Sequence, residues 1–151
     1  MTYYKKTEFG VLLNIALGLI SIITIGFFLF QIGSNPIPLI PVLGLTGLFL
    51  LIILSFYKLT ITIDDKKIEA KFGIGLIKRS LLLSEIDYST IEEIKVPATY
   101  GIGIRITPHG TLYNVKIGNA IKIKSHNKTF FVGTDEYTRI ENTLLELQPK
   151  E

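Results

Sequence analysis

The stretch FGVLLNIALGLISIITIGFFLFQI, residues 9–32, contains no charged residue. As a helix, its 24 residues would rise about 36 Å, which is more than the roughly 30 Å of a membrane's hydrocarbon core. A second uncharged stretch, IPLIPVLGLTGLFLLIILSFY at residues 37–57, would rise about 31 Å. These two segments explain a composition that is 48% hydrophobic and 19% charged, and both are predicted to be transmembrane helices.

A cleaved secretory signal is the alternative interpretation of the first stretch, because Lys5 and Lys6 precede it as the basic residues of a signal do. The apolar run is too long for a signal, no small-residue cleavage pattern follows it, and a second apolar stretch comes at once. The first stretch is therefore interpreted as a membrane anchor.

The connection between the two stretches, residues 33–36, is short and uncharged, which predicts an antiparallel helical hairpin with both chain ends on one side of the membrane. Lysines flank the hairpin on that side only, and basic residues favour the cytoplasmic side. These lysines are Lys5, Lys6, Lys58, Lys66, Lys67 and Lys71. The sequence therefore predicts a two-pass protein of the inner or plasma membrane with both termini in the cytoplasm.

Small residues in the two stretches predict how the helices pack, because lipid supplies no hydrophobic drive and close approach needs small side chains. In the first stretch Asn14, Gly18 and Gly26 fall on one face, and in the second Gly44 and Gly47 share a face. The two stripes are predicted to contact each other, with Asn14 hydrogen-bonded to the neighbouring helix. The alternative use of the stripes is assembly of several chains into a homo-oligomer.

After Tyr57 the apolar residues recur at every second position, which is the pattern of half-buried strands. Residues 59–63 and 68–72 are predicted to form an amphipathic hairpin directly behind the membrane, with a turn at 64–67. Further strands are predicted at residues 76–83, 91–96, 102–106, 112–117, 120–124 and 129–132, the last two separated by a break at 126–128.

The pattern changes to helical spacing near the end of the chain. Residues 137–147 carry apolar side chains at intervals of three or four, and either Thr134 or Asp135 can cap the helix. About seven strands and one amphipathic helix predict a domain over residues 58–151, a small β-barrel or bent sandwich with the helix closing one open end.

Several motifs in this domain resemble those of bacterial pleckstrin-homology-like (PH-like) membrane proteins, in which two transmembrane helices precede a cytoplasmic PH-like domain. The matching segments are GIGIR at 101–105, LYNV at 112–115, AIKIK at 120–124 and FFVGTDE at 130–136. Relatives often carry Trp where Ile102 stands and Pro where Tyr137 stands. The resemblance implies seven strands with a terminal helix, and it implies no enzymatic activity.

The stretch at 101–115 is predicted to be a hairpin, because Pro108 and Gly110 suit a type I turn. The turn chemistry alone would pair Arg105 with Tyr113, whereas keeping the apolar residues on one face pairs Ile104 with Tyr113. The apolar pattern is preferred here.

That register predicts Arg105 and Asn114 on the outer or rim face of the hairpin, near the mouth of the domain. Together with Tyr100 they are candidate binding residues. The alternative is that the three make structural hydrogen bonds and shape the turn.

Basic residues in and after the first hairpin are the second candidate site. They are Lys66, Lys67, Lys71, Lys78 and Arg79. The resemblance implies that lipid-binding PH domains hold phosphorylated headgroups in this region, and each basic side chain near an anionic membrane can contribute about 1 kcal/mol. Asp64 and Asp65 partly cancel this charge, so solvated strand faces are the alternative.

No motif in the chain predicts an enzyme, a cofactor or a metal site. The paired glycines lack the third glycine of a phosphate loop, no G-x-S-x-G nucleophile is present, and His109 and His126 lie in predicted turns without a second ligand. The net charge of +3 is too small for a nucleic-acid platform. The sequence predicts a membrane-anchored module that binds a protein or peptide, through a strand edge for example; the alternatives are an anionic-lipid sensor and an assembly component.

Overall fold

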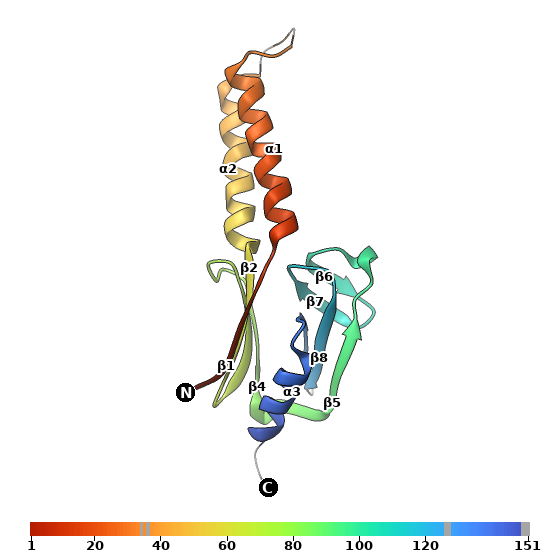
Figure 1. Ribbon diagram of the computed structural model, residues 1–151. Helices are drawn as coiled ribbons and strands as arrows, with labels where there is room; N and C mark the ends of the chain where they lie inside the picture. Colours follow the sequence, from red (N-terminus) through yellow and green to blue (C-terminus); the bar gives the residue numbers. More distant parts are fainter. Residues whose placement is uncertain (34, 36, 126–127, 149–151) are drawn as a thin grey trace.

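The computed structural model describes residues 1–33, 35, 37–125 and 128–148. It consists of two long helices and a β-rich domain with two sheets and a C-terminal helix (Figure 1). Some predicted features include positions outside the described residues. These positions are 34 and 36 in the connection between the helices, 126–127 in the break after residue 125, and 149–151 at the end of the chain.

The long helices, α1 (Val11–Leu29) and α2 (Leu39–Phe56), lie side by side and leave the β domain together (Figure 1). Both are long and apolar enough to cross a membrane. No residue of α1 is buried, and in α2 only Val42 and Ser55 are. An exposed apolar surface of this extent marks an interaction with lipid or protein, so the two helices are candidate membrane spans.

The first sheet, called sheet A here, is antiparallel with the strand order β1-β2-β3-β4. Its strands are β1 (Thr2–Phe9), β2 (Lys58–Asp64), β3 (Lys67–Phe72) and β4 (Lys78–Leu82). β1 was not predicted, because it is rich in charge and its partner β2 lies beyond both helices in the sequence. The β domain therefore includes residues from both sides of the helical pair.

The second sheet, sheet B, has the order β5-β8-β9-β7-β6, and its β7–β9 pair is parallel. Its strands are β5 (Ile86–Lys95), β6 (Gly103–Thr107), β7 (Gly110–Asn114), β8 (Asn119–Ser125) and β9 (Thr129–Gly133). Short 3₁₀ turns, η1 (Leu83–Glu85) and η2 (Ala98–Tyr100), precede β5 and β6. The prediction left a small barrel or a bent sandwich open, and of these the barrel is not formed: the described residues form nine strands in two separate, open sheets.

The helix α3 (Tyr137–Glu146) confirms the predicted C-terminal helix. Its cap differs from the prediction, because Glu136 occupies the cap position and makes no side-chain capping bond. The Thr134 hydroxyl instead accepts a hydrogen bond from the Glu136 N–H at 3.1 Å. Ile140 and Leu144 on the inner face of α3 are fully buried.

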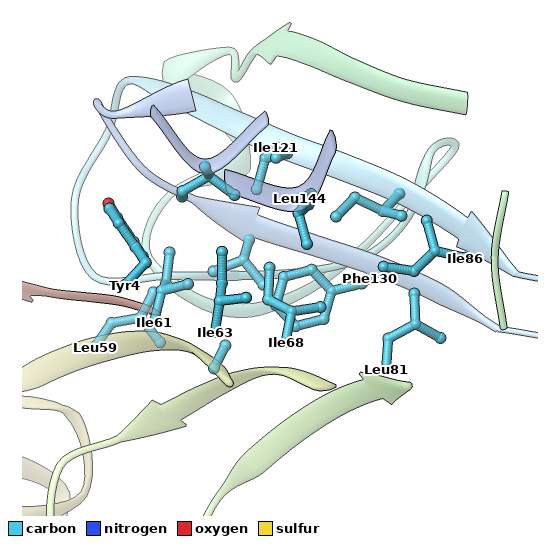
Figure 2. Close-up of a cluster of buried hydrophobic side chains, with 14 of the residues drawn as sticks. Tyr4, Leu59, Ile61, Ile63, Ile68, Leu81, Ile86, Ile121, Phe130 and Leu144 are labelled. Atoms are coloured by element: carbon cyan, nitrogen blue, oxygen red, sulfur yellow. The ribbon is translucent and has the colours of Figure 1, made fainter. Parts of the chain in front are cut away.

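The core lies between the two sheets (Figure 2). Leu59, Ile61 and Ile63 of β2 point toward sheet B, where Phe130 and Ile121 meet them. All five side chains are at most 1% exposed. Because each fully buried side chain of this size contributes about 2 kcal/mol, the alternation predicted for residues 59–63 is sufficient to set which face of β2 is inside.

The helical pair stands on one end of sheet A, because β1 continues into α1 and α2 continues into β2 (Figure 1). The Gly10 N–H donates to the Tyr57 carbonyl oxygen at 2.9 Å, which joins the start of α1 to the end of α2. We call this end of the domain proximal. The β2–β3 turn at residues 64–67 marks the opposite, distal end.

Candidate functional site

The outer face of sheet A carries polar and basic side chains. Strand alternation places Leu59, Ile61 and Ile63 in the core and Lys58, Thr60 and Thr62 on the outside. The register then sets outer residues beside one another in rows across the strands. The most proximal complete row is Thr7, Thr60, Lys71 and Lys78, and the next is Lys5, Thr62, Glu69 and Ser80.

A groove of about 510 Å³ crosses this face at its proximal end. Three lysines line it, Lys5, Lys58 and Lys71, from three different strands. Threonine hydroxyls from β1 and β2 form its floor, and the Thr7 and Thr60 hydroxyl oxygens lie 3.1 Å apart. We call this the lysine groove.

The charge in the lysine groove is positive. Its one acidic lining residue, Glu69, accepts a hydrogen bond from the Lys67 ammonium at 2.7 Å, and this contact raises the pKa of Lys67. Among the described residues, Lys5, Lys58 and Lys71 have no carboxylate within ion-pair distance. Three lysines therefore line the groove without a carboxylate partner among the described residues.

Local contacts hold two of these lysines in place. The Lys58 ammonium lies 5.0 Å from the centre of the Tyr57 ring, a cation–π contact. The Lys71 side chain crosses Gly75, where an added Cβ would lie 2.1 Å from the Lys71 Cε. Gly75 has φ +98°, a conformation that favours glycine, so the β3–β4 loop offers the end of the Lys71 side chain a surface without a Cβ.

The β3–β4 loop also joins the lysine groove to the end of α2. The Gly73 N–H donates to the Lys58 carbonyl oxygen at 2.8 Å, and the Ile74 N–H donates to the Leu54 carbonyl oxygen at 3.2 Å. Leu54 belongs to the last turn of α2. Ile74 is 56% exposed and Leu76 is 70% exposed, so the loop presents apolar side chains beside the end of this helix.

The five basic residues predicted as a lipid site are not brought together. Lys71 and Lys78 lie side by side at the proximal end, whereas Lys66 and Lys67 lie in the distal turn, about 13–17 Å further along the strands. Arg79 points inward and donates to the Thr129 carbonyl oxygen at 3.3 Å.

Sequence reasoning missed Lys5 and Lys58 as groove residues. Lys5 was missed because β1 was not predicted. Lys58 could have been found, because it continues the outward alternation of Thr60 and Thr62.

The hairpin of β6 and β7 confirms the preferred register, since Ile104 is paired with Tyr113. The predicted outer or rim position of Asn114 was wrong: the residue is fully buried. Its side-chain amide donates to the Gly101 and Lys116 carbonyl oxygens at 3.0 and 3.2 Å. Asn114 therefore ties two loops together at the proximal end of sheet B.

Arg105 lies on the exposed side of the same hairpin. Its guanidinium donates to the Tyr100 carbonyl oxygen at 3.1 Å. Tyr100, Arg105 and Asn114 therefore lie in one region of the domain. The hydrogen bonds described here for Arg105 and Asn114 all go to backbone carbonyl oxygens.

The predicted contact between the glycine stripes was wrong. A Cβ added at Gly18, Gly26, Gly44 or Gly47 would meet no atom within 4 Å, so these glycines make no close contact with the partner helix. Asn14 does contact the other helix, because its side-chain amide donates to the carbonyl oxygen of Tyr57, at the end of α2, at 3.4 Å. The same amide donates to the carbonyl oxygen of Gly10, at the start of its own helix, at 2.7 Å. A homo-oligomer built on the glycines stays a prediction.

No protein-family model, curated protein or solved structure matches the chain. Within the described ranges, no three His, Cys, Asp or Glu side chains are arranged to hold a metal ion. The resemblance to PH-like proteins stays a prediction, and function is argued from the geometry of the chain itself.

Proposed function

We propose that the protein is a membrane-anchored module whose two helices span the inner or plasma membrane and hold the β domain at the cytoplasmic surface. The length, composition and exposure of α1 and α2 support the spans. The lysines at the proximal end support the cytoplasmic placement of both termini, because basic residues beside membrane spans favour that side. The domain is then adjacent to lipid headgroups, since β1 and β2 continue directly into the helices.

The lysine groove binds anionic lipid headgroups in this proposal. The observation that carries it is the set of three lysines, Lys5, Lys58 and Lys71, which have no carboxylate partner among the described residues and line one groove that begins at the end of α2. Each contributes about 1 kcal/mol near an anionic surface, so together they would enrich an anionic lipid roughly a hundredfold. Threonine hydroxyls on the floor of the groove can donate to phosphate oxygens.

The test uses the full-length protein in vesicles that contain spin-labelled phosphatidylglycerol or phosphatidylcholine. Electron paramagnetic resonance measures the fraction of each lipid that the protein immobilises. The variant with Lys5, Lys58 and Lys71 replaced by Gln should lose the preference for phosphatidylglycerol that the parent protein shows. The matched control replaces three distal lysines, Lys66, Lys124 and Lys128, by Gln and should keep the preference.

Two outcomes would contradict the headgroup site. If the parent protein shows no preference, the groove does not select anionic lipid. If both triple variants lose the preference equally, the effect comes from total charge rather than from the groove.

A protein or peptide partner is the second candidate, and one observation favours it. Strand β6 is an edge of sheet B and pairs only with β7 among the described residues. Its Ile106 side chain is 94% exposed, so an extended peptide could add to this edge and cover it. A photoreactive residue at position 106 should then cross-link one partner in native membranes, and the substitution Arg105→Pro should abolish the cross-link.

A further inference from the structure

A second groove, of about 360 Å³, lies where α1 meets the proximal end of sheet B. One wall is the β1–α1 junction, with Phe9, Val11 and Leu12. The other wall comes from the loops that flank the β6–β7 hairpin, and it contains Ile102, Val115 and Ile117. We call this the apolar groove. It is distinct from the lysine groove, which lies on the outer face of sheet A.

Packing holds the two walls against each other. Gly10 permits the contact, because a Cβ there would lie 2.9 Å from the Phe56 carbonyl oxygen and 3.3 Å from the Val115 Cβ. The Lys116 ammonium reaches across from the hairpin side and forms an ion pair with the buried Glu8 carboxylate at 2.6 Å. The apolar groove is therefore a defined feature of the fold.

The chemistry of the lining selects the ligand class. Among the described residues, Lys116 is the only charged one that lines the groove, and both Glu8 and Asp135 neutralise it. The rest of the lining is hydrocarbon, and the volume lies within the range of about 300–1,000 Å³ typical of ligand pockets. An anion has no uncompensated positive charge to bind here, whereas an apolar chain meets matching walls.

The position of the groove indicates where an apolar ligand would come from. Val11 and Leu12 are 59% and 70% exposed, and they begin a helix that is long and apolar enough to cross a membrane. The lining is thus continuous with the apolar surface of α1. We propose that the apolar groove accommodates the acyl chain of a membrane lipid, in contact with both the helix and the β domain. This inference rests on the membrane insertion proposed above, but it does not require the lysine groove.

Tryptophan fluorescence tests the proposal, because the chain contains no Trp and one substitution gives a single reporter. Ile117→Trp places the reporter in the groove, Ile22→Trp places it on the exposed surface of α1, and Leu82→Trp places it at the distal end of sheet A. Each full-length variant is reconstituted in vesicles with lipids brominated on the acyl chain. Bromine should quench the first two reporters and leave the third unchanged, while aqueous acrylamide should quench the third more strongly than the first.

The Ile22→Trp control separates the two ways in which the proposal can fail. Quenching at position 22 without quenching at position 117 would show that the helix is in the membrane and the groove is not occupied by lipid. No quenching at position 22 would overturn the membrane insertion itself, and this inference with it.

A second measurement avoids a substitution in the groove. A phosphatidylcholine with a diazirine on its acyl chain should cross-link to residues 115–117 of the unmodified protein, and Val115→Asp should reduce the yield several-fold. Cross-links that instead join this segment to α1 of a second copy would overturn the proposal, because the groove would then be a protein interface.

Discussion

The carbonyl oxygen of Leu54, in the last turn of α2, accepts a hydrogen bond from the backbone N–H of Ile74 in the β3–β4 loop at 3.2 Å. This bond ties the loop of the β domain to the end of a candidate membrane span. Gly73 makes the approach possible, because an added Cβ there would lie 2.1 Å from the same oxygen. The same loop carries Gly75, against which the end of the Lys71 side chain lies, so the loop contacts both the helix and a lysine of the proposed site.

Replacement of Gly73 by Ala should destabilise the protein. The residue has φ +46° and its Cβ would collide with backbone atoms that cannot move aside, so the free energy of unfolding should fall by about 3 kcal/mol. Thermal unfolding of the full-length protein in detergent, followed by circular dichroism, measures the change. Gly47→Ala is the control, because its Cβ would meet no atom within 4 Å. Equal stability of the two variants would contradict the packing described here.

The ion pair between Glu8 and Lys116 should contribute measurably to stability. Glu8 is 6% exposed, so Lys116→Met would leave a buried carboxylate without its lysine partner. The expected loss is about 2 kcal/mol, less than the 3–5 kcal/mol of a fully buried pair because the Lys116 side chain is 34% exposed. Adding Glu8→Gln to Lys116→Met should recover part of that loss. A double-mutant cycle in denaturant measures the coupling, and a coupling near zero would show that the pair contributes nothing.

The carboxylate of Glu136 should make stability depend on pH. It accepts hydrogen bonds from the Lys6 ammonium at 2.5 Å and the Tyr4 hydroxyl at 2.9 Å, which lower its pKa below the ordinary 4.5. Because the folded state binds the proton more weakly than the unfolded state, this stabilisation is complete above pH 4.5 and is lost as pH falls through the folded-state pKa. Glu136→Gln should therefore flatten the decline of the unfolding midpoint as pH falls below 4.5.

The exposed Glu146, also on α3, supplies the matched control for this pH dependence. Glu146→Gln should leave the decline as steep as in the parent protein. A Glu136→Gln variant with the same decline as the parent would show that the hydrogen bonds to Lys6 and Tyr4 do not favour the charged form.

Asn114 and Arg105 should respond differently to replacement by Ala. Asn114→Ala leaves the Gly101 and Lys116 carbonyl oxygens without its amide, and the free energy of unfolding should fall by about 2 kcal/mol. Arg105→Ala removes an exposed side chain and should change stability by less than about 0.5 kcal/mol. Chemical denaturation of both variants measures the difference. A stable Asn114→Ala protein would reopen a binding role for this residue.

Local patterns were sufficient to predict much of the fold. The two apolar stretches predicted α1 and α2 within three residues at each end, because helix length and composition are properties of the chain alone. Alternation at residues 59–63 predicted which face of β2 is buried, and the apolar pattern of the β6–β7 hairpin predicted its register. Each of these features depends on residues that are close in the sequence.

The candidate site was predicted only in part. Of the lysines that line the groove only Lys71 was identified, and Lys78 lies beside it. Lys66 and Lys67 were grouped with them by closeness in sequence although they lie at the other end of the hairpin. Lys5 was missed because its strand pairs across the whole helical hairpin. A strand separates its two ends by about 3.3 Å per residue, so neighbours in the sequence need not be neighbours in a site.

The sequence by itself determined the apolar helices, the β-rich character of the domain, the amphipathic C-terminal helix and the basic character of the first hairpin. Only the tertiary structure decided that β1 joins sheet A, that the two sheets stay open, and that the glycine stripes make no close contact with the partner helix. Periodicity reports which side of an element is buried, but it does not identify the element that covers it. The lysine groove and the apolar groove both depend on such long-range neighbours, so they became visible only in the folded chain.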